Sequence, residues 1–274
     1  MTLKNGLSEE LNRQGNEYFG RGHYTDAYTC YAKALECDRM TGDQRALAAT
    51  LGNLGNICAV SGRRDAAQSY YQEVLELQKI LGDEKGIGTT LANLGNLRAD
   101  AGEWDRARAY YLEALDLMTK TRDEAAKAVL FSDLGLIARE TGQFDEAIAY
   151  YEKSLLLMRR LGNDGGVADA WRMMARTFLL QRRFDDAIAC CQTSQSVAER
   201  SRDELRTGGA RYVLADCYEA MGRIEDAAHL LERVVEMDRK YRLPKLEENT
   251  NRLQSLRVRI AAASAPPPLR ESRG

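Results

Sequence analysis

Hydrophobic residues recur along most of this chain at the spacing of an amphipathic helix. Between residues 51 and 58, Leu51, Leu54 and Cys58 fall on one helical face, with Gly55 among them. A second apolar stripe of the same kind follows a short polar break that contains Gly62. Residues 1–243 contain no proline, the residue that interrupts helices most strongly. The pattern therefore predicts pairs of helices joined by short turns.

The predicted helix pair repeats with a period of 40 residues. The segment LGNLGNICAVSG at Leu51 is echoed by LANLGNLRADAG at Leu91 and by FSDLGLIARETG at Phe131. One position of the repeat is alanine in six successive units, at Ala27, Ala67, Ala107, Ala147, Ala187 and Ala227. A single helix pair cannot bury its apolar face alone, so we expect the units to stack on one another.

Turn residues between the predicted helices carry the signals of helix ends. Gly62 and Gly82 stand where the end of a helix favours a left-handed residue. Aspartates that follow the turns are expected to accept backbone N–H groups at the start of the next helix. The expected caps are Asp65, Asp105, Asp145 and Asp185 for second helices, and Asp43, Asp83, Asp123 and Asp203 for first helices.

These recurring positions resemble the tetratricopeptide repeat. In the first unit, the residues that match its pattern are Leu11, Gly15, Tyr18, Gly22, Tyr24, Ala27, Tyr31 and Ala34. The 40-residue period resembles the long-helix subgroup of this family, which includes kinesin light chain, LGN-type adaptors and bacterial arrays. The resemblance implies an all-α fold, a right-handed α-α superhelix (solenoid) of six helix-turn-helix units over residues 8–243, after an N-terminal extension at residues 1–7.

The sequence changes character after the sixth unit. Leu246, Leu253, Leu256 and Ile260 fall on one side of a helix, and Pro244 suits the first turn of that helix. We therefore predict a capping helix at residues 244–262 that covers the last open face of the array. The remaining segment, residues 263–274, contains three consecutive prolines and few apolar residues and is predicted to be disordered.

Composition narrows the classes of function. The net charge of −2 provides no strong basic field for nucleic acid, so no nucleic-acid partner is expected. The sequence has no run of about 20 apolar residues that could span a bilayer and no apolar N-terminal signal. The six cysteines form no CxxC motif, and only two histidines are present, so neither a metal site nor a cofactor is expected. Buried free thiols fit a reducing compartment, which favours the cytoplasm.

The segment at Leu51 also places Gly52 and Gly55 close together, as a phosphate-binding loop would. A phosphate loop needs a preceding strand and a lysine, and this segment has neither. Gly55 recurs at a position that accepts only glycine or alanine, so we expect it to mark a close approach of two helices. Gly52 has no such repeat, and its role is left unexplained.

The opposite face of each first helix is the candidate binding surface. In the family that the chain resembles, this face lines a concave groove for partner peptides. Asparagine amides offer both donors and an acceptor, so they can hydrogen-bond to a peptide backbone. A pair of arginines four residues apart can bind a carboxylate. The candidate groove residues are Asn16, Asn53, Asn56, Asn93, Asn96, Asp133, Arg139, Arg172 and Arg176. The same residues could instead be solvated polar groups, and the asparagine echo could reflect repeat duplication.

The leading functional hypothesis is a protein-interaction adaptor or scaffold that binds a partner peptide or helix in this groove. Two alternatives are a regulator that senses a short peptide and a scaffold that self-associates end to end. An enzyme is disfavoured because the two histidines, His23 and His229, do not stand beside a candidate nucleophile.

Overall fold

The computed structural model describes the backbone of residues 2–264 and the side chains of residues 6–263. Thirteen α-helices and no strand occur in this described part of the chain. In order, they are α1 (Thr2–Gly20), α2 (Tyr24–Thr41), α3 (Gln44–Val60), α4 (Arg64–Leu81), α5 (Glu84–Ala99), α6 (Trp104–Lys120), α7 (Glu124–Glu140), α8 (Phe144–Arg160), α9 (Asp164–Leu180), α10 (Phe184–Arg200), α11 (Glu204–Ala220), α12 (Ile224–Tyr241) and α13 (Leu246–Ser264). The predicted tail concerns mainly residues 265–274, which lie outside the described residues.

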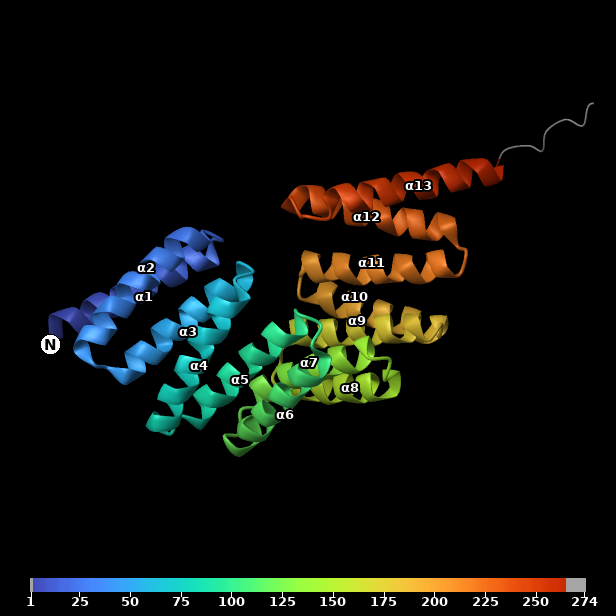
Figure 1. The fold of residues 1–274 in the computed structure, drawn as a ribbon. Coiled ribbons are helices and arrows are strands. Elements are labelled where there is room, and N and C mark those ends of the chain that lie inside the picture. Colours follow the sequence, from blue (N-terminus) through green and yellow to red (C-terminus); the bar gives the residue numbers. More distant parts are fainter. Residues whose placement is uncertain (1, 265–274) are drawn as a thin grey trace, which may run out of the picture. The chain divides into compact units, whose positions relative to one another are not determined.

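The chain divides into two compact units, residues 1–137 and residues 138–274, with the boundary inside α7. In the first unit, α1, α3 and α5 each pack against the helix that follows them, and α3 also contacts both α1 and α5 (Figure 1). The first helices of neighbouring repeats therefore share one layer. The core of this unit includes Leu51, Leu54 and Tyr31, each at most 2% exposed.

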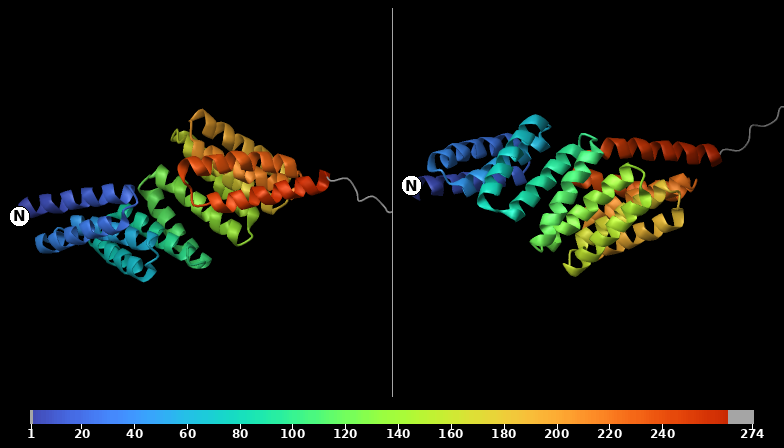
Figure 2. Two further views of the ribbon diagram at one scale, coloured as in Figure 1. Left: turned by 90° about the horizontal axis from the view of Figure 1, so that it is seen from above. Right: turned by 60° about the horizontal axis from the view of Figure 1, so that its bottom comes forward.

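The second unit repeats this arrangement with α9 and α11 in contact and α10 and α12 packed against them (Figure 2). The final helix, α13, packs on α12 through the buried Leu253 and Leu256, with Leu246 and Ile260 partly buried beside them. This helix begins at Leu246, so Pro244 lies in the turn before it rather than in its first turn.

Helix ends follow the sequence signals in most places. Gly62 and Gly82 adopt left-handed φ angles of 72° and 66°. At the starts of first helices, the predicted aspartate caps are confirmed: Asp83, for example, accepts the N–H of Gly86 at 2.9 Å. The same role is seen for Asp43, Asp123 and Asp203.

The predicted caps at the starts of second helices are wrong. The helix α4 begins at Arg64, and its N-cap residue is Arg63, whose side chain makes no capping bond. The N–H of Arg63 donates to Cys58 O at 2.8 Å, which carries the chain directly from one helix into the next. Asp65 therefore lies inside the first turn, where its charge still favours the positive helix end. Asp105, Asp145 and Asp185 lie in the first turn in the same way.

Candidate functional site

The recurring glycine of the first helix packs against a tyrosine of the second helix. A Cβ atom built on Gly55 would lie 2.5 Å from Cε1 of Tyr71, closer than real side chains allow. Gly15 faces Tyr31 and Gly95 faces Tyr111 with similar separations of 2.4 and 2.5 Å. The predicted close approach of two helices is therefore confirmed, and the group that requires glycine is an aromatic ring.

The asparagine that follows each of these glycines is bonded to the same tyrosine. The hydroxyl of Tyr71 donates to Asn56 Oδ1 at 2.8 Å. The hydroxyls of Tyr31 and Tyr111 donate to the equivalent amides of Asn16 and Asn96, both at 2.6 Å. Sequence reasoning missed this bond, although one signal was present: asparagine and tyrosine occur 15 residues apart in all three units. Each of these amide oxygens already accepts one bond within its repeat.

Two further asparagines connect neighbouring first helices. Asn53 Nδ2 donates to Asn12 Oδ1 at 3.1 Å, and Asn93 Nδ2 lies 3.4 Å from Asn56 Oδ1. The amide nitrogens of Asn56 and Asn96 make no hydrogen bond to a described residue. These two nitrogens are therefore free donors on the first helices α3 and α5 of the first unit.

A cleft of about 550 Å³ in the first unit brings four predicted site residues together. We call it the amide cleft. Its predicted members are Asn56, Asn93, Asn96 and Asp133, and its other walls include Phe19, Tyr71, Leu97, Asp100, Tyr111 and Leu136. Asn16 and Asn53 do not line it.

The amide cleft is acidic. Asp100 and Asp133 are its charged residues, and no lysine or arginine lines it. Burial raises the pKa of Asp133 to about 6, and this carboxylate has no hydrogen bond or ion pair with a described residue. Burial also raises the pKa of Tyr111, with a smaller contribution from the charges of Asp133 and Asp100. The cleft thus holds a desolvated carboxylate that lacks a positive partner.

The three predicted arginines lie in the second unit and differ from one another. Arg172 Nη2 pairs with Asp169 Oδ1 at 3.0 Å, so the predicted fork with Arg176 is already partly occupied. Arg139 is buried and pairs with Glu140 at 2.7 Å. Arg176 is half-buried and has no hydrogen bond or ion pair with a described residue. Burial lowers the pKa of Arg176, and the positive charges of Arg172 and Arg139 lower it further.

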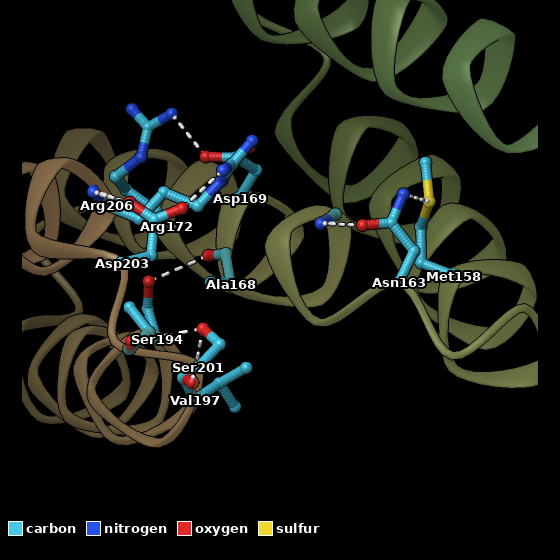
Figure 3. A network of polar contacts seen from close by, with 12 residues as sticks. Met158, Asn163, Ala168, Asp169, Arg172, Ser194, Val197, Ser201, Asp203 and Arg206 are labelled. Carbon is cyan, nitrogen blue, oxygen red and sulfur yellow. Dashed lines mark hydrogen bonds and ion pairs between the residues drawn. The ribbon is translucent and has the colours of Figure 1, made fainter.

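Asp169 is shared between two arginines. Figure 3 shows both arginines close to it, and Arg206 Nε lies 2.9 Å from Asp169 Oδ2. Arg206 also contacts Asp203, the N-cap residue of α11, at 2.6 Å. This network fixes the side of α9 that carries Arg172.

A second cleft, of about 560 Å³, includes Arg172 and Arg176 but not Arg139. We call it the arginine cleft. It lies where α9 and α11 meet the turn between α12 and α13, a junction that the repeat pattern does not predict. Its other walls include Leu205, Tyr212, Met237, Leu243, Pro244, Lys245 and Asn249.

Within residues 2–264, no group of three or more His, Cys, Asp and Glu side chains could hold a metal ion. All six cysteines are free, and five of them are buried. In the same range, no helix has the length and apolar character needed to cross a membrane.

Comparison with known proteins identifies the repeat. A family model of the tetratricopeptide repeat matches residues 10–80, 46–120, 86–160, 125–188 and 166–240. No curated protein sequence matches the chain.

Three solved structures illustrate the likeness of the fold. One is a signal transduction ATPase with numerous domains and a tetratricopeptide repeat sensor from Pyrococcus horikoshii (TM-score 0.74, 14% identity). The match covers 90% of this chain but only 38% of the ATPase. Another is a Rap protein complexed with Competence and Sporulation Factor (TM-score 0.66, 14% identity, 92% of this chain and 75% of that one). A third is a putative kinesin light chain from Podosopora anserina with nearly identical TPR-like repeats (TM-score 0.58, 18% identity, 71% and 96%).

These identities show a shared fold alone, and they confirm the predicted α solenoid and its likeness to kinesin light chain repeats. The family matches run from residue 10 to residue 240, which is most of the chain. This chain therefore belongs to the tetratricopeptide repeat family.

Proposed function

We propose that this chain is a protein-interaction scaffold that binds an extended segment of a partner protein in the amide cleft. One observation carries the proposal: the free amide nitrogens of Asn56 and Asn96 stand at equivalent positions of successive repeats, on the wall of one cleft. Proteins of this repeat family are generally binding modules without catalysis, and we propose that role here, in the cytoplasm. The fold it shares with a Rap protein complexed with Competence and Sporulation Factor supports a binding role.

The tyrosine bonds prepare the asparagines for this role. Because Tyr71 and Tyr111 fix the oxygens of the two amides, each NH₂ group points in a set direction before a ligand arrives. A ligand then loses less side-chain entropy on binding than it would with mobile amides. Peptide carbonyls are the natural acceptors, so the amides would hold the backbone of the segment and leave its sequence to other contacts.

The charge of the cleft adds one sequence requirement. Asp133 is desolvated without a positive partner, and Asp100 is the other charged residue of the cleft. A lysine or arginine in the bound segment would supply the missing charge. The same acidity disfavours nucleic acid, whose phosphates would meet no cation here.

Peptide selection tests the proposal with a matched pair of variants. A random peptide display library is selected on the wild-type chain, and a fluorescein-labelled peptide of the recovered consensus is titrated by anisotropy. Asn56→Ala/Asn96→Ala removes the free amide nitrogens together with the tyrosine bonds. Tyr71→Phe/Tyr111→Phe removes the same two tyrosine bonds and keeps the amides.

We expect affinity to fall at least about tenfold in the alanine variant and to change less than about threefold in the phenylalanine variant. Equal losses in both variants would mean that the asparagines serve only the fold. No loss in either variant, or no peptide recovered at all, would refute binding in the amide cleft. Thermal melting by circular dichroism checks that both variants are folded.

A further inference from the structure

Two fully buried cysteines are in contact in the second unit. Cys191 lies on α10 and Cys217 on α11, both are 0% exposed, and both belong to the same hydrophobic core cluster. The thiol of Cys191 donates a hydrogen bond to the sulfur of Cys217, and both thiols are free. A disulfide between them therefore needs only a short movement of two sulfur atoms that already touch.

The cysteine pair replaces an ordinary apolar contact of the repeat. Three repeat periods earlier, the equivalent positions hold Tyr71 and Leu97, which also share one core cluster. The chain has only six cysteines, yet both members of this one contact are cysteine. The repeat requires apolar bulk at these positions, so its packing does not account for two thiols in contact.

The hydrogen bond makes the two thiols unequal. It lowers the pKa of Cys217, which accepts the bond, and raises the pKa of Cys191, which donates it. Burial raises the pKa of the neighbouring Cys190 to about 11, so this third thiol stays protonated. Because the thiolate is the reactive form, Cys217 is the first sulfur to react, and Cys191 is placed to complete a disulfide with it.

We propose that Cys191 and Cys217 form a reversible disulfide when the chain meets hydrogen peroxide. The Cys217 sulfur attacks one peroxide oxygen, the O–O bond breaks, and the hydroxide leaves as water with the thiol proton, which gives a sulfenic acid. The Cys191 sulfur then attacks the Cys217 sulfur, the S–O bond breaks, and a second water leaves with the Cys191 proton. The two sulfurs together lose the two electrons that the peroxide gains. A dithiol reductant returns two electrons and two protons by thiol–disulfide exchange.

The disulfide would join two neighbouring repeats. The helix α10 is the second helix of the fifth repeat, and α11 is the first helix of the sixth. In stacked repeats each unit is held by its neighbours, so units near an end of the array open locally more easily than the rest. Such opening admits peroxide to the buried pair, and the new bond then restricts it. This inference does not rest on the proposed function, because the amide cleft lies in the first unit.

Mass spectrometry of the full chain tests the bond directly. The reduced chain is treated with a small molar excess of hydrogen peroxide, blocked with N-ethylmaleimide and digested with trypsin without reductant. Trypsin leaves Cys191 in the peptide 184–200 and Cys217 in the peptide 212–223. We expect these two peptides, joined by a disulfide, to be the main oxidised product, and dithiothreitol to separate them. Oxidation of the chain in urea should instead give a mixture of cysteine pairings, and the same mixture from the folded chain would overturn the proposal.

Single variants assign the bond to its two sulfurs. Cys190→Ala should keep the joined peptides, because Cys191 is then the only cysteine of the peptide 184–200. Cys217→Ala should abolish them. Cys58→Ala is the matched control, because Cys58 is also 0% exposed but lies on α3 of the first unit, and it should leave their yield unchanged. Loss of the joined peptides in Cys190→Ala, or a Cys217 in the oxidised wild type that is sulfinic acid or still a free thiol, would refute the pair.

Thermal melting by circular dichroism tests whether the bond restrains the fold. The oxidised wild type should melt at least about 5 °C above the reduced wild type, because the disulfide closes the chain between residues 191 and 217. Cys217→Ala should show no rise after the same treatment, and its melting in reductant checks that it folds. An unchanged or lower melting temperature in the joined wild type would overturn the restraint. Asn56→Ala/Asn96→Ala should show the same rise as the wild type, so a failure of the amide cleft leaves this result intact.

Discussion

The amide cleft and the arginine cleft use equivalent repeat positions but carry opposite charge. Residues 56, 96 and 176 are separated by multiples of the 40-residue period, yet the first two are asparagines and the third is an arginine. The charged residues of the amide cleft are Asp100 and Asp133, whereas Arg172, Arg176 and Lys245 line the arginine cleft. One fold therefore carries two clefts of different charge.

The difference begins on the second helix of the repeat. Tyr71 and Tyr111 place a ring against glycine and a hydroxyl on asparagine. In the fifth repeat, Cys191, a smaller side chain that needs no such acceptor, stands at the tyrosine position, and Ala175 replaces the glycine. No tyrosine hydroxyl therefore bonds the residue at the asparagine position of this repeat, which is the charged Arg176.

The largest expected effect on stability comes from replacing the glycine that packs against the tyrosine ring. Gly55→Ala places a Cβ 2.5 Å from the Tyr71 ring, and overpacking of this kind costs about 3 kcal/mol against a gain of about 1 kcal/mol in helix propensity. We expect a net loss of about 2 kcal/mol in the free energy of unfolding, measured by urea denaturation.

Gly52→Ala is the matched control for this prediction. It lies in the same helix with no atom within 4 Å of the added Cβ, so we expect stabilisation of up to about 1 kcal/mol. Equal effects at Gly55 and Gly52 would contradict the ring contact. Ala175→Gly should destabilise by about 1 kcal/mol, because no tyrosine ring demands glycine there.

The fold could be read from the sequence because the period constrains every unit at once. Six units in register, with glycines at the turns, leave the stacked helix pair as the consistent solution. The period alone could not show whether the asparagines serve the fold or a ligand. Their tyrosine partners are 15 residues away on another helix, and a face pattern alone cannot distinguish a bond within the repeat from a contact with a ligand.

The candidate sites show the same limit. The pairing of Arg172 with Asp169 was readable from their spacing of three residues along a helix, which is a contact distance on the helix surface. The arginine cleft could not be predicted from the sequence, because it depends on where the turn at Leu243 and Pro244 meets α9 and α11. Periodicity specifies the repeated parts of this protein and says little about the place where the repeat ends.

The acidity of the amide cleft gives an effect of similar size that depends on pH. Burial raises the pKa of Asp133 to about 6 from an ordinary value of 3.8, so the folded state is penalised when this group is charged. The penalty is absent well below the ordinary pKa, grows as the pH rises between the two values, and is complete above about pH 6. Asp133→Asn should therefore stabilise the chain by about 2 kcal/mol near pH 8 and by much less near pH 4.5. Urea denaturation at several pH values measures this difference, and a pH-independent difference would contradict the desolvated carboxylate.

Removing the tyrosine hydroxyl should change the free energy of unfolding less than Gly55→Ala or Asp133→Asn does. Tyr71→Phe keeps the ring against Gly55 and removes the bond to Asn56, so we expect a loss of about 1 kcal/mol in the free energy of unfolding. Tyr24→Phe, at a tyrosine that is 42% exposed, serves as the control and should change stability by less than about 0.5 kcal/mol. Similar values for the two variants would mean that the asparagine bond contributes nothing measurable to the fold.

The smallest expected change in stability concerns Asp169, whose carboxylate Arg172 and Arg206 share. Asp169→Asn removes that negative charge, and all three side chains are partly exposed. Such pairs contribute little, so the free energy of unfolding, measured by urea denaturation, should change by less than about 0.5 kcal/mol. Asp145→Asn, at an exposed acid elsewhere in the second unit, is the control and should change it equally little. A clearly larger loss at Asp169 than at Asp145 would show that the shared carboxylate holds α9 against α11, because Arg206 reaches Asp169 from α11.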